Sequence, residues 1–186
     1  MAIRRRGIKY IVTALGLCLA LVPGAWADQA RLDQLFDQLK NATPENHDAI
    51  EKSIYDAWSQ SGSATIDLLL KRGQDALQAG DAQAAVEHFT AAIDHAPDFA
   101  EAYDGRASAY FQLDLVGPAL DDLRQTLVLN PRHFGAMRGI AIIMEEIGND
   151  RQALAVYQAA LALDPMATDV QDAITRLQQK LEGRAL

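Results

Sequence analysis

Apolar residues recur at helical spacing between residues 66 and 165 of this 186-residue chain, and a proline interrupts the pattern at a regular interval. In residues 82–95 the apolar positions fall at i, i+4, i+7 and i+8, which is the spacing of one face of an α-helix. Because proline cannot continue a helix, it marks the end of each such run. The interval is 34 residues, and the prolines are Pro97, Pro131 and Pro165. The sequence therefore predicts three repeated units, at residues 66–99, 100–133 and 134–167.

Each unit is expected to contain two amphipathic helices joined by a tight turn. In the first unit, Gly80 is a good C-terminal stop for one helix, and Asp81 is a good N-cap for the next. The equivalent turn falls at Asp114 and at Gly148 in the other two units. Two further positions of each unit are small and let helices approach closely: Ala85, Ala119 and Ala153 at one, and Ala92, Thr126 and Ala160 at the other.

These residues resemble the tetratricopeptide repeat (TPR), whose pattern of W-x2-L-G-x2-Y, A-x3-F and P also spans 34 residues. The middle unit carries the pattern at Tyr103, Arg106, Ala107, Tyr110, Ala119, Leu123 and Pro131. The resemblance covers residues 66–165 and implies an all-α fold, an α-solenoid in which three helical hairpins form a right-handed superhelix.

The seventh position of the unit departs from the TPR pattern. The family prefers leucine there, but the first two units have Arg72 and Arg106. Their guanidinium groups either pair with nearby carboxylates while their stems pack, or reach a carboxylate of a ligand. Both interpretations fit their 34-residue spacing.

Two flanking segments complete the expected fold. Residues 28–65 predict an N-terminal helical hairpin, with Asn41 to Pro44 between its helices. This hairpin is a possible degenerate repeat, because Tyr55 and Trp58 lie 34 residues before Phe89 and Ala92. Residues 168–186 predict a single amphipathic helix with a polar end, which is typical of the capping helix of a helical stack.

Residues 1–27 have the three-part order of a secretory signal peptide. Four basic residues come first, a short apolar run follows, and Ala25 and Ala27 stand at the −3 and −1 positions of a cleavage site. The apolar run is shorter than the roughly 20 residues of a membrane-spanning helix. We therefore expect export to the periplasm or beyond with cleavage after Ala27, and no stable membrane insertion afterwards. The alternative is an uncleaved N-terminal anchor.

Loss of the signal peptide would change the charge and the cysteine content. Thirteen of the 17 Lys and Arg residues would remain beside 25 Asp and Glu, for a formal charge near −12. So acidic a chain argues against nucleic acid as the partner. The single cysteine, Cys18, would leave with the signal, so no disulfide, thiol nucleophile or cysteine ligand is expected.

The sequence contains no recognisable catalytic constellation. The adjacent carboxylates Glu145 and Glu146 would point about 100° apart on a helix and do not converge. His88 and His95 share a helix face without a third ligand at useful spacing. Neither a phosphate-binding glycine-rich loop nor a Ser-His-Asp arrangement is present. We therefore expect no enzyme, no cofactor and no metal site.

The TPR resemblance implies a binding surface instead. In this family the first helices of successive units line a concave groove that holds a peptide or a helix of a partner. Carried over to this chain, the groove residues are Asp67, Leu70, Gln74, Leu77, Gln78, Glu101, Asp104, Ser108, Phe111, Gln112, Gly135, Arg138, Ile142, Glu145 and Glu146. Five of them are carboxylates and one is an arginine, which favours a basic or apolar partner segment. The solubility of an acidic chain is the alternative explanation of these carboxylates.

The expected function is that of a non-enzymatic protein–protein interaction module. With its N-terminal hairpin and C-terminal helix, the chain resembles small exported TPR proteins of Gram-negative bacteria. That resemblance implies an adaptor, scaffold or assembly factor of the bacterial cell envelope. The alternative is a structural solenoid protein that associates with itself through its open ends, as a homo-oligomer.

Overall fold

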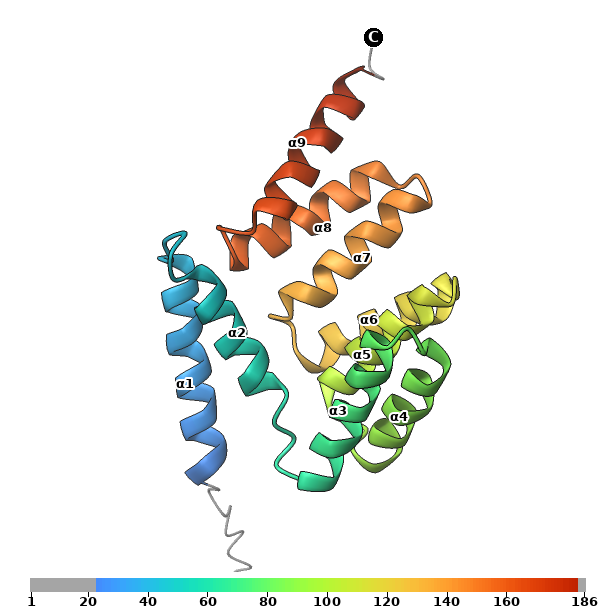
Figure 1. Ribbon diagram of the computed structural model, residues 1–186. Coiled ribbons are helices and arrows are strands. Elements are labelled where there is room, and N and C mark those ends of the chain that lie inside the picture. The colour runs from blue at the N-terminus through green and yellow to red at the C-terminus, as the bar shows by residue number, and fades with distance from the viewer. Residues whose placement is uncertain (1–22, 184–186) are drawn as a thin grey trace, which may run out of the picture.

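The structure is a computed structural model that describes the backbone of residues 23–183 and the side chains of residues 29–183. Within this range the chain is all-α, without a strand (Figure 1). Its helices are α1 (Pro23–Lys40), α2 (His47–Trp58), α3 (Ala64–Gln78), α4 (Ala82–His95), α5 (Ala100–Gln112), α6 (Val116–Leu129), α7 (Phe134–Glu146), α8 (Asp150–Leu163) and α9 (Thr168–Gly183).

Helices α3 to α8 form three stacked helical hairpins, and α9 packs on α8 at the end of the stack. The three turns lie at the expected positions: Gly80, Asp114 and Gly148 have positive φ angles of 79°, 56° and 81°. Asp81 caps α4, because its side chain accepts a hydrogen bond from the backbone N–H of Ala84. The fold is therefore the all-α helical repeat that the 34-residue period predicts.

Phe89 of α4 fixes how closely the first two hairpins approach. Its side chain is fully buried, and its ring lies against the backbone of two glycines, Gly73 in α3 and Gly105 in α5. A Cβ atom at either glycine would lie 2.5 Å from the ring, so both positions require the absence of a side chain. One aromatic ring thus joins the helices of two successive units, which explains the small residues at these places.

The contacts of Arg106 distinguish between the two interpretations of the arginine at the seventh position of the repeat. Its guanidinium group donates to both carboxylate oxygens of Asp122 in α6, at 2.7 and 2.8 Å, and to the hydroxyl of Thr90 at 3.2 Å. The rings of Tyr103 and Tyr110 flank it. Arg106 is therefore part of the packing between helices, as the first of the two interpretations held. Arg72, its counterpart in the first unit, is exposed on α3.

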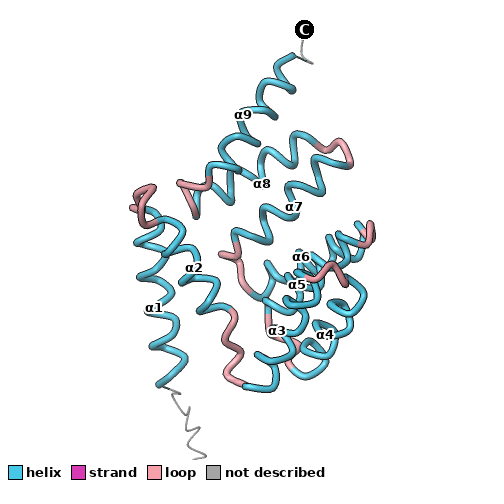
Figure 2. Tube along the Cα trace, viewed as in Figure 1, coloured by secondary structure: helices cyan, strands magenta, loops and turns pink. Residues whose placement is uncertain are grey.

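Helices α1 and α2 do not continue the stack. A repeat placed before the first unit would pack α2 against α3, but an extended joint at residues 59–63 leads α2 away from α3 (Figure 2). The pair instead lies across the open side of the repeat array, near α8 and the start of α7 (Figure 1). Helices α1 and α2 pack on each other as a hairpin, and the position of this hairpin differs from that of a degenerate repeat.

An aromatic cluster holds this N-terminal pair in place. Trp58 of α2 stacks on His133, with ring centroids 4.5 Å apart, and Phe36 of α1 lies edge-on to Phe134. Arg132, in the turn before α7, pairs with Asp33 of α1 at 2.8 Å and covers the ring of Phe36. Side chains in the turn before α7 and at the start of α7 therefore form the surface on which α1 and α2 pack.

Most of the expected signal peptide, residues 1–22, lies outside the described residues. Cleavage after Ala27 would fall inside α1, ahead of its buried residues Phe36 and Leu39. Among the helices that the structure describes, none is both long enough and apolar enough to span a membrane.

Candidate functional site

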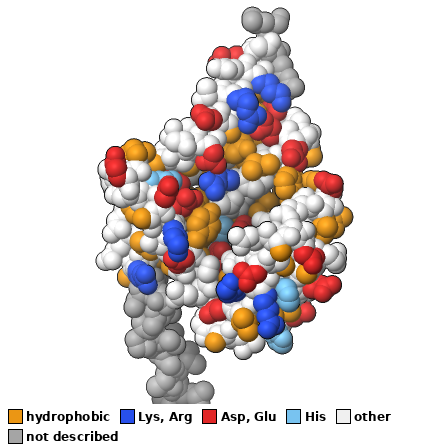
Figure 3. Space-filling view, in the orientation of Figure 1, with side chains coloured by type: hydrophobic (Ala, Val, Ile, Leu, Met, Phe, Trp, Pro, Cys, Tyr) orange, Lys and Arg blue, Asp and Glu red, His pale blue; other side chains and the backbone are white. Residues whose placement is uncertain are grey.

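A cavity of about 280 Å³ lies between α2, α5 and α7. Ala107, Leu123, Gly139 and Ile143 give it an apolar floor, and its polar groups are Tyr55, Asp104, Ser108 and Arg138. In the space-filling view, hydrophobic side chains surround a hollow between α2 and the repeats (Figure 3). Two successive repeats and the N-terminal pair therefore contribute to one concave site.

Six of the residues expected to face the groove line this cavity, and one of them is Gly135. The other five also come from α5 and α7 and are Asp104, Ser108, Phe111, Arg138 and Ile142. Ile142 is 43% exposed, an unusual state for isoleucine, and lies among these cavity residues. Gly135 lies close to the hydroxyl of Tyr55. The residues that the TPR register assigns to the inner faces of α5 and α7 thus lie together at this cavity, and their role in binding stays a prediction.

The expected residues on α3 do not reach this cavity. Leu70 is 3% exposed and belongs to the core of the first repeat, so it offers no apolar anchor to a partner. Asp67 accepts hydrogen bonds from the backbone N–H and the hydroxyl of Ser61 in the joint. Leu77 is half-buried against the same core. The remaining two, Gln74 and Gln78, are exposed.

The carboxylates of the expected groove are largely bonded within the protein. Glu101 is buried and accepts a hydrogen bond from Nε2 of His133 at 2.8 Å. Glu145 pairs with Arg176 of α9. Glu146 is exposed and lies away from the cavity, as does the neighbouring groove residue Gln112. Together with Asp67, which bonds to Ser61, three of the five carboxylates that had favoured a basic partner are thus bonded within the protein.

His133 connects the cavity to the aromatic cluster. It is fully buried, its Nδ1 accepts the backbone N–H of Ala136, and its Nε2–H donates to Glu101. Burial alone would lower the pKa of His133, but its hydrogen bond to Glu101 and the charge of Asp104 raise that pKa above its ordinary value. This histidine thus caps α7 and orients the carboxylates beside the cavity.

Asp104 is the most perturbed carboxyl group of the site. Burial raises its pKa to about 6, the nearby Glu101 adds to the rise, and His133 and Arg138 oppose it. Arg138 is shared, because it also faces Glu51 of α2 at 3.8 Å and Asp169 of α9 at 3.5 Å. The cavity therefore places a weakly acidic carboxyl group beside a bridging guanidinium group.

This raised pKa predicts a pH dependence of stability. An Asp104 carboxyl group with a pKa near 6 in the fold and near 3.8 when unfolded loses protons on unfolding, so stability falls as the pH rises from about 4 to about 6. We expect Asp104→Asn to be more stable than wild type at pH 8 by about 1–2 kcal/mol, and equal to it at pH 4. The gain at pH 8 is smaller than the full pKa shift would give, because the side chain is partly exposed. Urea unfolding at both pH values measures this. The exposed Asp75→Asn serves as the control, and an equal change in both variants would contradict the prediction.

Sequence reasoning missed Tyr55 as a lining residue. It reaches the cavity from α2, and only the folded position of the N-terminal pair brings it there. Leu123 and Ile143 were also missed as part of the floor, although the small residue Gly139 of α7 signals the close approach of this helix to Leu123.

The family model described as "Tetratricopeptide repeat" matches residues 70–117 and 116–168, which is more than half of the chain. The chain belongs to the tetratricopeptide repeat family. A TPR repeat-containing protein of Rhizobium etli is 36% identical over 154 residues, which cover 82% of this chain and 76% of that relative. The TPR assignment thus rests on sequence as well as on the stacked hairpins.

Solved TPR domains have the same fold at low sequence identity. The first TPR domain of Spaghetti (RPAP3), bound to an HSP90 peptide, superimposes with a TM-score of 0.62 at 22% identity, covering 64% of this chain and 95% of that domain. The TPR2B domain of yeast Sti1, in complex with an Hsp70 peptide, gives a TM-score of 0.59 at 21% identity, covering 63% and 99%. These similarities establish the repeat fold.

Proposed function

We propose that this TPR protein is a non-enzymatic interaction module that binds a segment of a partner protein in the cavity between α2, α5 and α7. One observation carries the proposal: six groove residues from two successive repeats converge on a single cavity of about 280 Å³. TPR domains of similar fold are known in complex with HSP90 and Hsp70 peptides, which supports a peptide-binding role.

The cavity favours an apolar anchor in the partner. Its floor is apolar, and its rim carries Phe111 and the exposed Ile142. An apolar side chain of the partner that fills the floor removes this surface from water, which is the main source of affinity at such sites. A basic residue beside the anchor would face Asp104, whereas Glu101 and Glu145 already have partners. The proposed ligand is therefore an apolar segment, with a basic flank as its second feature.

The proposed location is the periplasm of a bacterium, where the protein would act as an adaptor, scaffold or assembly factor for envelope proteins. Residues 1–27 support this part of the proposal through their basic, apolar and small-residue order. Removal of these residues would leave the buried positions of α1 in place.

Ile142→Asp tests the site. The substitution puts a carboxylate at the rim of an apolar cavity, and burying it unpaired against a partner costs about 1–3 kcal/mol, or roughly a tenfold loss of affinity or more. The matched control is Val128→Asp on α6, because Val128 is 73% exposed and does not line the cavity. A crosslinked pull-down from the cell envelope of the source bacterium compares the two variants with wild type.

We expect a partner that wild type and Val128→Asp retain and Ile142→Asp loses. A partner that all three retain would place the binding site elsewhere on the molecule and contradict the proposal. Recovery of further copies of this chain alone would favour the self-associating solenoid instead.

A further inference from the structure

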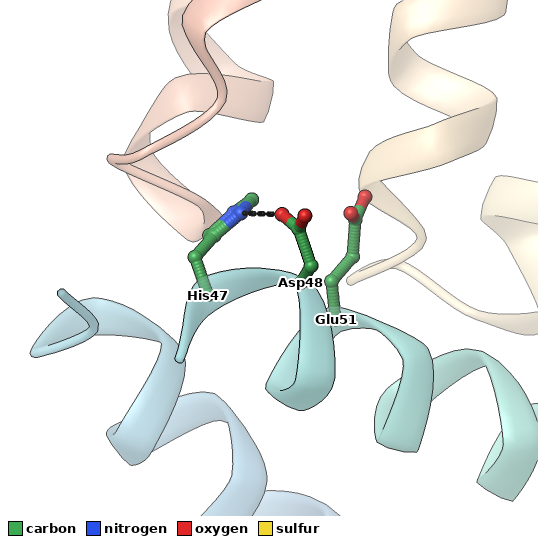
Figure 4. A group of neighbouring side chains, drawn as sticks. All are labelled: His47, Asp48 and Glu51. Atoms are coloured by element: carbon green, nitrogen blue, oxygen red, sulfur yellow. Dashed lines mark hydrogen bonds and ion pairs between the residues drawn. The ribbon is translucent and has the colours of Figure 1, made fainter. Parts of the chain in front are cut away.

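A second cluster of polar side chains lies at the beginning of α2, outside the cavity described above. His47, Asp48 and Glu51 each offer a ligand atom, and these atoms all lie within 4.8 Å of one another. The three side chains project from the same side of α2 (Figure 4). They line a second hollow of about 330 Å³, whose other walls include Arg138 of α7 and Asp169 of α9. The hollow is therefore bordered by α2, α7 and the start of α9.

Asp164, in the turn between α8 and α9, orients the ring of His47. Its Oδ1 lies 2.8 Å from Nε2 of His47, so this nitrogen carries a proton and donates it to the carboxylate. Asp164 is 1% exposed, and its Oδ2 has no hydrogen-bond partner among the described residues. A buried carboxylate that accepts from one ring nitrogen is the usual support behind a histidine whose other nitrogen binds a metal.

The other ring nitrogen of His47 faces a second carboxylate. Nδ1 lies 3.0 Å from Oδ1 of Asp48 (Figure 4). Two lone pairs at this distance repel each other, so a positive charge must lie between them, either a proton or a metal ion. The separation is that of a hydrogen bond from a protonated Nδ1. A Zn²⁺ ion that replaced this proton would hold ligands at about 2.1 Å from the ion and about 3.4 Å from each other, and the Asp48 side chain, which is 97% exposed, is free to make that small shift.

The charges around the cluster leave an excess of negative groups. Asp48, Glu51, Asp164 and Asp169 are four carboxylates. Against them stand Arg138, which contacts Glu51 at 3.8 Å and Asp169 at 3.5 Å, and His47 if it carries a second proton. A divalent cation offsets this excess better than one additional proton does.

We propose that His47 Nδ1, Asp48 and Glu51 form a binding site for a divalent transition-metal ion of the Zn²⁺ class. One imidazole nitrogen and two carboxylate oxygens are a donor set for Zn²⁺ rather than for the all-oxygen sites of Ca²⁺ or Mg²⁺. The hollow leaves room for water in the open coordination position. The ion would bind to α2 alone, and the hydrogen bond from His47 to Asp164 connects this site to the turn between α8 and α9.

Isothermal titration of the purified protein with Zn²⁺ tests this site. We expect one saturable site in wild type. Asp48→Asn, which removes a ligand charge without changing shape, should weaken binding at least tenfold, and Asp164→Asn should weaken it about 10–100-fold through the orientation of His47. The control is Asp56→Asn on the same helix, an exposed residue bonded to Lys52, which should bind as wild type does.

A thermal readout separates loss of the site from loss of the fold. At a Zn²⁺ concentration near the dissociation constant of wild type, the ion should raise the melting temperature of wild type and of Asp56→Asn clearly more than that of Asp48→Asn, while all three melt alike without metal. Absence of saturable Zn²⁺ binding by wild type overturns the proposal. Equal affinity in Asp56→Asn and in either cluster variant overturns it as well, because the metal would then bind at other groups.

Discussion

Replacement of Phe89 by alanine is expected to lower the free energy of unfolding by about 3–5 kcal/mol, the range for a large aromatic residue removed from a packed core. Phe89 is fully buried, and its ring is the surface on which the backbones at Gly73 and Gly105 rest. Those glycines cannot fill the vacated space, because they have no side chains. The cavity would therefore open between the first two repeats and weaken both.

Urea unfolding followed by circular dichroism measures this loss. Leu68→Ala is the control, because Leu68 lies on α3 of the same repeat and is 48% exposed. We expect the control to change stability by no more than about 0.5 kcal/mol. Equal losses in the two variants would contradict the role given to Phe89 in joining the repeats.

The second large effect is expected at Trp58, where substitution by alanine should release the N-terminal pair from the repeats. Trp58 is 9% exposed, stacks on His133, and contacts the rings of Phe36 and Phe134. Its loss should cost about 3–5 kcal/mol of the interaction that holds α1 and α2 in place. The helices α3 to α9 pack mainly on one another, so they should remain folded.

Limited proteolysis distinguishes this local release from global unfolding. In Trp58→Ala the joint at residues 59–63 should be cut faster than in wild type, with residues 64–183 surviving as a fragment. Trp58→Phe is the matched control: Nε1 of Trp58 has no hydrogen-bond partner among the described residues, so phenylalanine keeps the ring contacts and loses no bond. Equal cleavage of wild type and Trp58→Ala would show that Trp58 does not anchor the pair.

The repeats were predictable because local signals agree with one another. The 34-residue spacing of the prolines, the turn residues and the apolar face of residues 82–95 each specify the same hairpins, and the structure has them at those places. The first hairpin begins at Ala64, two residues before the predicted boundary, because the period fixes the spacing of the units and not the first helical residue.

The position of α1 and α2 was not predictable in the same way. Trp58 and Tyr55 fall in the register of a repeat, which suggested an additional unit, but their rings pack on His133 and Phe134 instead. No local rule in the sequence specifies contacts between residues some 75 positions apart. The surface on which α1 and α2 pack consists of single side chains at the start of α7, and these side chains show no periodicity in the sequence.

The candidate site, like the fold, could be predicted from the sequence only in part. The TPR register placed Asp104, Phe111 and Ile142 on the inner surface, where they line the cavity. It also counted Glu101 as a free acid, although His133 partners it, and it gave no sign that Tyr55 would form one wall. The cluster at His47 was missed as well, because its orientation depends on Asp164, which is distant in sequence. Its local signal was the four-residue spacing of His47 and Glu51 on one helix face.

The protein covers part of its own concave face with α1 and α2, which leaves the cavity between α2, α5 and α7. The most direct test is a measurement of through-space nuclear Overhauser effects between the ring protons of Trp58 and those of His133. Their ring centroids are 4.5 Å apart in the arrangement described, so cross-peaks between the two rings are expected. Assigned spectra in which both rings are observed and no such cross-peak appears would show that α2 lies elsewhere, and would contradict the account of the site.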